Sequence, residues 1–289
     1  MDLDLLSITD VSEPKSFKDG DNLVSVIKKY GSLEGAIEPI TTVRASQALD
    51  LCPRYAVFTQ ILPLPGEGAK FDSKANLRMA TGTFLHSFFQ DEVLGPAGVL
   101  KGFWRDEKGE VSEGFYPKEE GVFKYQEYDL KIDSGLITGH VDGLVCLNRL
   151  ALVASGDPIT DDVEENLVHL EIKTTDDGGV KKVRDGGSDE LPLRYKTQAT
   201  IYQRGLEVDE TLFLYVDRKY FGFATFLYRG EDSLYDDVVA KAHSIPQAME
   251  DKVLPERHSG CLSASFPKAK ACPYKDFCFA ENAEDVWDL

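Results

Sequence analysis

The sequence predicts an α/β protein of the α+β kind, in which a mixed central sheet is flanked by helices. Residues 103–145 and 211–229 alternate aromatic and β-branched side chains with polar ones, broken by Gly and charged turns, which is typical of strands and hairpins. Helical periodicity appears in three segments, at residues 83–94, 193–206 and 233–252. We expect the last of these helices to break near Pro246, because proline lacks the amide hydrogen that a helix interior needs.

The amino-terminal part of the chain is expected to contribute short helices. One is predicted at Leu23–Tyr30, and a second helical pattern begins at Ser46, a residue type that caps helices, with Pro53 following. A loop rich in Pro and Gly covers residues 62–68. The Gly-Pro pair at 95 and 96 is expected to end the helix at 83–94.

Two predicted strands matter most, Leu136–Leu147 and Leu167–Thr175. An acidic, solvated loop at 155–166 lies between them, and a glycine-rich stretch at 176–188 follows the second. We expect one domain over residues 1–289. Its expected parts are an amino-terminal helical lobe at 43–100, a β-rich core at 101–230, and a carboxyl-terminal helix with a cysteine-bearing segment at 231–289.

Composition narrows the class of protein. An apolar content of 42% with 28% charged residues is ordinary for a globular protein, and the sequence has no long uncharged run that would span a membrane. The first ten residues, MDLDLLSITD, carry acids where a secretory signal carries basic residues, so we expect a cytoplasmic protein. The formal charge of -18 argues against non-specific coating of nucleic acid, which depends on Lys and Arg.

A local basic groove is still compatible with this charge. The candidate lining, for which a solvated loop and helix face is an equal alternative, is Lys181, Lys182, Arg184, Arg194, Lys196 and Arg204.

Two acids and a lysine are the strongest chemical signal. In a strand, side chains two residues apart share a face, so Glu171 and Lys173 point the same way. If the two key strands pair, Asp142 can lie beside Glu171 and offer a second carboxylate to Mg²⁺ or Mn²⁺. Phosphodiester hydrolysis needs an activated water and stabilised charge, which a bound cation and a lysine supply. The alternative for Glu-x-Lys is a solvent-facing ion pair.

Four elements in this order resemble the PD-(D/E)XK nuclease superfamily, and specifically its RecB-like branch of CRISPR-associated, phage and recombination exonucleases. They are Thr81-Gly82-Thr83-Phe84-Leu85-His86, Gly139 to Asp142, Glu171-Ile172-Lys173, and Gln198 with Tyr202. The resemblance implies a restriction-endonuclease-like core with Asp142, Glu171 and Lys173 as the catalytic set. It also implies His86 and the Ile172 carbonyl as further metal ligands, and Gln198 and Tyr202 as residues that hold the phosphate or the DNA backbone. His140 and His169 are interpreted as supporting or structural residues.

The cysteines predict a second site. An odd count of five, without a secretory signal, argues against a disulfide framework. Cys52 before the core and Cys261, Cys272 and Cys278 after it resemble the iron-sulfur clasp of part of the same branch, which implies a structural [4Fe-4S] cluster joining the two chain ends. Ten residues separate Cys261 from Cys272 where the family usually has two. A zinc site and unligated buried cysteines remain alternatives, and Cys146 is expected to be a buried small apolar residue.

The resemblance implies a Mg²⁺- or Mn²⁺-dependent exonuclease that acts on single-stranded DNA ends in recombination, repair or phage DNA metabolism. A trimming endonuclease of CRISPR adaptation and a catalytically silent DNA-binding or assembly module of the same fold are the alternatives. A homo-oligomer, or a complex with a recombination or CRISPR partner protein, is compatible with each.

Overall fold

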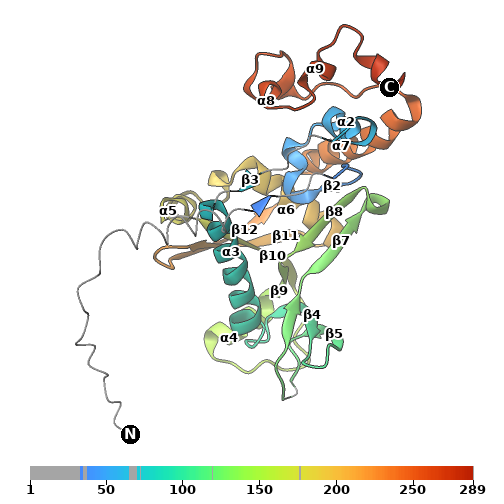
Figure 1. Cartoon of the computed structure of the whole chain (residues 1–289). Helices are drawn as coiled ribbons and strands as arrows, with labels where there is room; N and C mark the ends of the chain where they lie inside the picture. The colour runs from blue at the N-terminus through green and yellow to red at the C-terminus, as the bar shows by residue number, and fades with distance from the viewer. Residues whose placement is uncertain are drawn as a thin grey trace, which may run out of the picture. The chain divides into compact units, whose positions relative to one another are not determined.

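The computed structural model describes residues 33–34, 38–64, 70–71, 73–118, 120–175 and 177–288 (Figure 1). The predicted helix at Leu23–Tyr30 lies outside them. The chain divides into two compact units, Met1–Ile37 with Gly66–Ala80 and Glu38–Pro65 with Thr81–Leu289. In the smaller unit, β1 (Leu33–Glu34) pairs antiparallel with β3 (Lys70–Phe71), and α3 (Ser73–Ser87) begins. The other elements below belong to the larger unit.

A seven-stranded mixed sheet is the centre of the larger unit. Its order is β12-β11-β10-β9-β4-β5, with β6 also pairing with β4. The strands are β4 (Leu100–Arg105), β5 (Val111–Phe115), β6 (Lys124–Gln126), β9 (Gly143–Cys146), β10 (Leu167–Thr175), β11 (Glu210–Asp217) and β12 (Phe223–Arg229). Strands β10 and β11 are parallel, and the other pairs in this sheet are antiparallel. The predicted mixed sheet is therefore confirmed, as is strand β10 with its predicted bounds.

A second, three-stranded sheet has the order β2-β8-β7, from β2 (Val43–Arg44), β7 (Tyr128–Ile132) and β8 (Ile137–Val141). The predicted single strand Leu136–Leu147 is in fact two strands, because the chain leaves β8 in this sheet and enters β9 in the larger one. The residue between them is Asp142. Glu127 occupies the corresponding place between β6 and β7.

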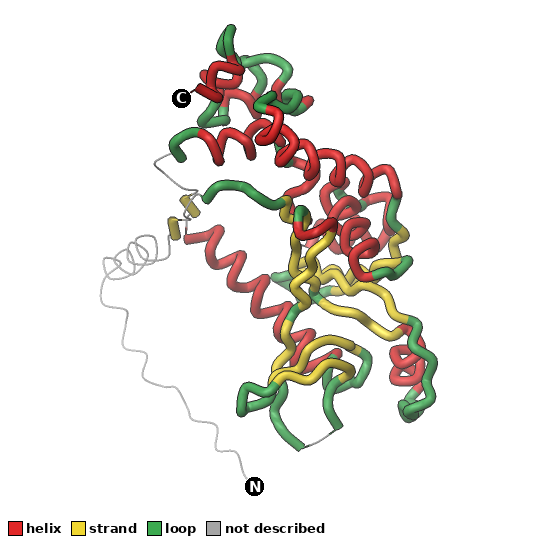
Figure 2. Tube along the Cα trace, turned by 90° about the vertical axis from the view of Figure 1, so that its right-hand side faces the viewer, coloured by secondary structure: helices red, strands yellow, loops and turns green. Residues whose placement is uncertain are grey.

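Helices flank the sheets (Figure 2). The main ones are α2 (Pro53–Ile61), α4 (Leu147–Ser155), α5 (Asp177–Gly186), α6 (Leu193–Leu206) and α7 (Asp232–Asp251), with two four-residue helices, α8 (Pro267–Lys270) and α9 (Lys275–Cys278). Short 3₁₀ turns add η1 (Ala45–Asp50), η3 (Asp133–Gly135), η4 (Gly187–Glu190), η5 (Ser259–Cys261) and η6 (Ala283–Asp288). A π-helical segment, η2 (Phe88–Leu94), follows α3. Within the described residues no helix has the length and apolar character to cross a membrane.

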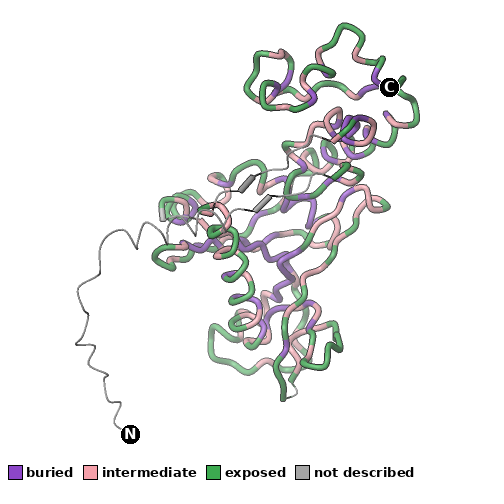
Figure 3. The backbone as a smooth tube through the Cα atoms, in the orientation of Figure 1, coloured by how far each residue is buried: buried purple, intermediate pink, exposed green. Residues whose placement is uncertain are grey.

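Helix α6 belongs to the crossover that joins the parallel strands β10 and β11. Parallel neighbours need such a connection, and it lays a helix against the sheet. Residues Thr197–Gln203 of α6 are all buried. The crossover therefore holds Gln198 and Tyr202 over the strand that carries Glu171 and Lys173, and the buried strands of this region stand out in Figure 3.

One local expectation is wrong: helix α7 continues through Pro246, since Ala242 and Ile245 are buried beside it. Within the glycine-rich stretch, Asp177–Gly186 forms helix α5, whose Val180 and Val183 are buried in a cluster that also holds Phe213. The helical pattern that begins at Ser46 lies in the 3₁₀ turn η1, and Pro53 begins helix α2, because proline suits the first turn.

Candidate metal and catalytic site

Two acids face each other where the chain passes between the two sheets. Strands β7 and β8 pair antiparallel up to Tyr128 opposite Val141. One step further in the same register, Glu127 lies opposite Asp142. Like charges directly opposite each other destabilise a ladder. Two opposed carboxylates are therefore costly unless a proton or a cation lies between them.

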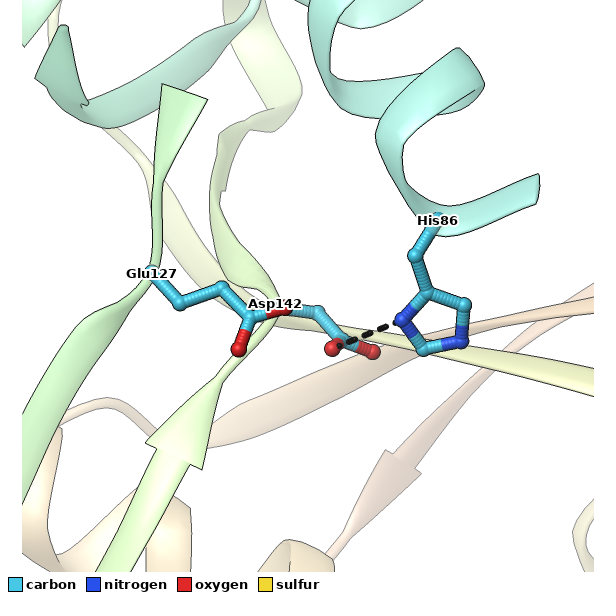
Figure 4. Close-up of side chains that lie close together, drawn as sticks. All are labelled: His86, Glu127 and Asp142. Atoms are coloured by element: carbon cyan, nitrogen blue, oxygen red, sulfur yellow. Dashed lines mark hydrogen bonds and ion pairs between the residues drawn. The ribbon is translucent and has the colours of Figure 1, made fainter. Parts of the chain in front are cut away.

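His86 completes this group. The second half of α3 brings the His86 ring to Asp142, with Nδ1 3.1 Å from Oδ1 (Figure 4). Ligand atoms of His86, Glu127 and Asp142 all lie within 4.8 Å of one another, and within the described ranges this is the one such group of three. Nitrogen and carboxylate oxygens at this spacing suit a single divalent ion.

Asp142 is fixed by more than His86. Its Oδ2 accepts a hydrogen bond from the Ile172 backbone N–H at 2.7 Å, and its carbonyl accepts one from Gln90 Nε2 at 2.8 Å. Burial would raise the pKa of Asp142, but the hydrogen bond and charge of His86 outweigh it and lower that pKa. For His86, burial opposes the charged ring, yet Asp142 holds its pKa above the ordinary value. The carboxylate is thus held ionised in the metal-free protein.

Glu171 and Lys173 form a buried ion pair beside this group. Oε1 of Glu171 accepts from the Lys173 ammonium, while Oε2 is buried with no hydrogen-bond partner among the described residues. Burial raises the pKa of Glu171 to about 7, although Lys173 opposes the shift. Burial works against the Lys173 charge, but Glu171 and Asp142 raise its pKa overall. An orphaned buried carboxylate oxygen next to a nitrogen-and-oxygen ligand group fits a site built for a cation.

Helix α6 supports the lysine. Gln198 Oε1 accepts from Lys173 Nζ at 3.2 Å, and Gln198 Nε2 donates to the Tyr202 hydroxyl at 3.4 Å. The Lys173 ammonium also lies 4.6 Å from the ring centre of Tyr195. Gly139 leaves room for Tyr202, because a Cβ at that position would meet the ring at 2.5 Å. Steric contact with Tyr202 therefore explains why the Gly-x-x-Asp element has a glycine at position 139.

The two histidines on the key strands differ. His169 is fully buried, with Nδ1 3.0 Å from Thr211 Oγ1 and Nε2 3.4 Å from Glu171 Oε2, and burial lowers its pKa to about 3. His140 is exposed and pairs with Asp129 at 2.8 Å. Neither belongs to the ligand group of three.

The six predicted DNA-contacting cations lie on two helices. Three lie on α5 and three on α6, and two of them are paired with carboxylates, Lys182 with Glu190 at 2.7 Å and Arg204 with Asp232. Arg184 donates to the Phe223 carbonyl at 2.9 Å. Arg194 is linked to the site through Tyr195, because its guanidinium and the Lys173 ammonium both contact the Tyr195 ring. Lys181 is exposed and Lys196 half-buried.

The four predicted cluster cysteines line one small cavity. All are free thiols, and the cavity wall is formed by Cys52, Cys261, Cys272 and Cys278 together with Arg54, Tyr55, Phe58, Arg257, His258, Ala269, Lys275 and Phe279. No three of their sulfurs lie within 4.8 Å of one another, the spacing of a single-ion group. Cys146 is fully buried on β9, as expected.

Sequence reasoning missed Glu127. It follows β6 in a short run, Gln126-Glu127-Tyr128, that matches none of the four motif elements. Its approach to Asp142 depends on the register of β7 against β8 and on the bend between the sheets, which no spacing along the chain reveals. The one local signal is an acid flanked by strand residues.

Comparisons with known proteins give distant structural likenesses. The sequence matches no family model, and no curated protein matches it. Among solved structures, an alkaline exonuclease from Laribacter hongkongensis, LHK-Exo, aligns with a TM-score of 0.42 and 13% identity over 74% of this chain and 90% of that one. Its complex with dAMP gives a TM-score of 0.41 and 12% identity over the same shares.

The protein SSO0001 aligns over 92% of this chain and 98% of that one, with a TM-score of 0.37 and 12% identity.

Proposed function

We propose that this protein is a metal-dependent DNA exonuclease that hydrolyses phosphodiester bonds at single-stranded ends. The observation that carries the proposal is the convergence of His86, Glu127 and Asp142 within 4.8 Å, beside a buried Glu171–Lys173 pair. A stabilising ion pair alone would not need three further ligand-type side chains at its edge. Buried, perturbed titratable groups gathered in this way are typical of functional sites.

Mg²⁺ or Mn²⁺ would be held by Asp142, Glu171 and His86, with Glu127 as an additional ligand. The Ile172 carbonyl joins this set: in a strand, the N–H and C=O of one residue point to the same side, and the Ile172 N–H points at Asp142. When bound, the ion acidifies a water molecule and withdraws charge from the phosphate.

The protein's own groups have separate tasks in this proposal. Lys173 orients the attacking water and offsets the negative charge that grows on the phosphate oxygens. Gln198 gives the Lys173 ammonium a second partner besides Glu171, and Tyr202 positions the amide of Gln198. To orient the water and to offset the phosphate charge, Lys173 must stay protonated. Its raised pKa supports this.

A cavity beside the site offers room for the DNA strand. It measures about 450 Å³ and is lined by Gln198 and Tyr202 on one side and by residues of the β7–β8 hairpin on the other. Arg44 and Lys131 contribute positive charge to it, and Asp129, which pairs with His140, contributes one negative charge. Two cations in a cavity of this size would contact the phosphate backbone.

The test is a nuclease assay on end-labelled single- and double-stranded DNA and on circular single strands, with Mn²⁺ or with EDTA. We expect wild-type protein to shorten linear single strands only with metal, and Lys173→Ala to lower the rate about 10²- to 10³-fold. Lys118→Ala is the matched control, since Lys118 is an exposed lysine paired with Asp161. Cleavage of circles would indicate an endonuclease. If wild type leaves every substrate intact, the catalytically silent module is correct.

We further propose that the cysteine cavity holds a structural [4Fe-4S] cluster. Four free thiols from both ends of the larger unit meet at one cavity. A [4Fe-4S] cluster is bound by four cysteine thiolates, and the cavity wall contains four cysteines. Burial raises the pKa of Cys261 and of Cys272, and the neighbouring thiols add to that rise.

Anaerobic purification tests the cluster. We expect an absorbance band at roughly 400 nm, from thiolate-to-iron charge transfer, together with iron and acid-labile sulfide. Cys272→Ser should remove all three signals, and Cys146→Ser is the matched control because Cys146 is buried elsewhere, on β9. Bound zinc without iron would contradict the proposal.

A further inference from the structure

A chain of buried polar groups leads from the β12–α7 turn to Glu171. Gln203 Oε1 accepts from the Gly230 backbone N–H at 2.8 Å, and Gln203 Nε2 donates to the Tyr228 carbonyl at 2.9 Å. A backbone N–H can only donate and a carbonyl can only accept, so the orientation of the Gln203 amide is fixed. The same Nε2 donates to Thr211 Oγ1 at 2.8 Å.

The next step fixes a histidine tautomer. Thr211 Oγ1 accepts from Gln203 and lies 3.0 Å from His169 Nδ1, and its own hydrogen has no other acceptor in the described part of the chain. The hydroxyl therefore donates to Nδ1. A neutral ring that accepts at Nδ1 carries its hydrogen on Nε2.

That hydrogen is on the ring nitrogen nearest the catalytic acid. His169 Nε2 lies 3.4 Å from Glu171 Oε2, a close polar contact rather than a hydrogen bond, and neither of these buried atoms has a hydrogen-bond partner in the structure as described. The opposite tautomer would leave the Thr211 hydrogen without an acceptor and set a bare nitrogen lone pair against a carboxylate oxygen. Both consequences are unfavourable.

We propose that Gln203, Thr211 and His169 form a relay that holds the Glu171 carboxylate in the orientation in which it binds the metal. The inference rests on the proposed function, since it assigns Glu171 a ligand's task. His169 is a positioning residue: it restrains one side of Glu171 while Lys173 holds the other. Residues that orient a metal ligand from behind are worth about 10- to 100-fold in metal affinity.

Two substitutions distinguish the contribution of His169 Nδ1 from that of Nε2. In His169→Asn the amide can replace Nδ1 opposite Thr211 but reaches no farther, whereas in His169→Gln the longer amide can place an N–H near the position of Nε2. We expect His169→Asn to weaken Mn²⁺ binding about 10- to 100-fold in calorimetry and His169→Gln to restore most of it. Thr211→Val, which removes the hydroxyl, should fall between them. Thermal unfolding in EDTA checks that the variants are folded.

Nitrogen-15 NMR of histidine-labelled wild type tests the tautomer without metal or variants. We expect His169 to carry its hydrogen on Nε2, and finding it on Nδ1 would overturn the relay. So would equal Mn²⁺ affinities of wild type and His169→Asn, or equal losses in the Asn and Gln variants. Wild type that binds Mn²⁺ but hydrolyses no DNA would overturn the nuclease proposal and leave the relay standing.

Discussion

The carboxylate site and the cysteine cavity are held together in different ways. At the carboxylate site most polar atoms already have partners, apart from Glu171 Oε2: Asp142 pairs with His86 and with the Ile172 N–H, and Glu171 pairs with Lys173. Ile172, Glu171 and Lys173 all lie on the regular strand β10. The thiols, by contrast, face a cavity from short elements, among them the four-residue helices α8 and α9. The first site is therefore largely preformed, whereas in our proposal the second is completed only when a cluster binds.

The largest expected effect is a loss of nuclease activity without a loss of stability. Asp142→Asn removes the charge shared by the ligand group and should lower nuclease activity by about 10³-fold or more, as measured on end-labelled single-stranded DNA. Its melting temperature in EDTA should stay close to that of wild type, because the amide keeps an oxygen for the Ile172 N–H. Loss of fold in this variant would contradict the idea of a preformed site.

At the cysteine cavity, in contrast, we expect a substitution to lower stability. Cys272→Ser should reduce the free energy of unfolding by about 3 kcal/mol, since a cofactor that binds only the folded state contributes on that order. Chemical denaturation under anaerobic conditions measures it, with Cys146→Ser as control. An unchanged midpoint would mean that the thiols contribute no bound group to stability.

The pH dependence of metal-free stability isolates Glu171. Its folded pKa of about 7 lies above its ordinary value of 4.5, so its contribution is present below pH 4.5 and is lost as the pH rises through 7. Stability in EDTA should therefore fall across this range, by on the order of 2 kcal/mol. Glu171→Gln should remove most of that slope. A slope that survives the substitution would assign it to another group.

The smallest expected effect concerns the opposed acids. In metal-free protein, Glu127→Gln relieves the repulsion from Asp142 and should raise the free energy of unfolding by about 0.5 kcal/mol. The same change should weaken Mn²⁺ binding in calorimetry, because it removes a charged ligand. Opposite signs for the two measurements distinguish a metal ligand from a simple structural acid, for which Mn²⁺ affinity would not change.

Much of the site follows from strand periodicity. Alternation along β10 was enough to predict that Glu171 and Lys173 share a face, and the strand bounds at Leu167–Thr175 are those of the structure. The spacing of four between Gln198 and Tyr202 brings their side chains together, and Gln198 accepts from Lys173. These features depend on local geometry, which a sequence displays directly.

Features that depend on distant neighbours could not be predicted. Helix α5 forms in a glycine-rich stretch because Val180 and Val183 are buried against β11, and α7 tolerates Pro246 for a similar reason. Glu127 enters the site only through the register of β7 with β8. Each case needs information on which segments meet, and neither propensity nor motif spacing contains it.

The positions of Glu127 and Asp142 have a mechanical consequence. Each lies at a joint where the backbone steps from one sheet to the other, and the hairpin beyond those joints forms one wall of the 450 Å³ cavity. A cation bound by both acids would link the two joints and restrict the motion of the hairpin. Backbone amide hydrogen exchange in Tyr128–Val141 should then slow when Mn²⁺ is added, and a DNA strand bound along that wall would transmit force to the same cation.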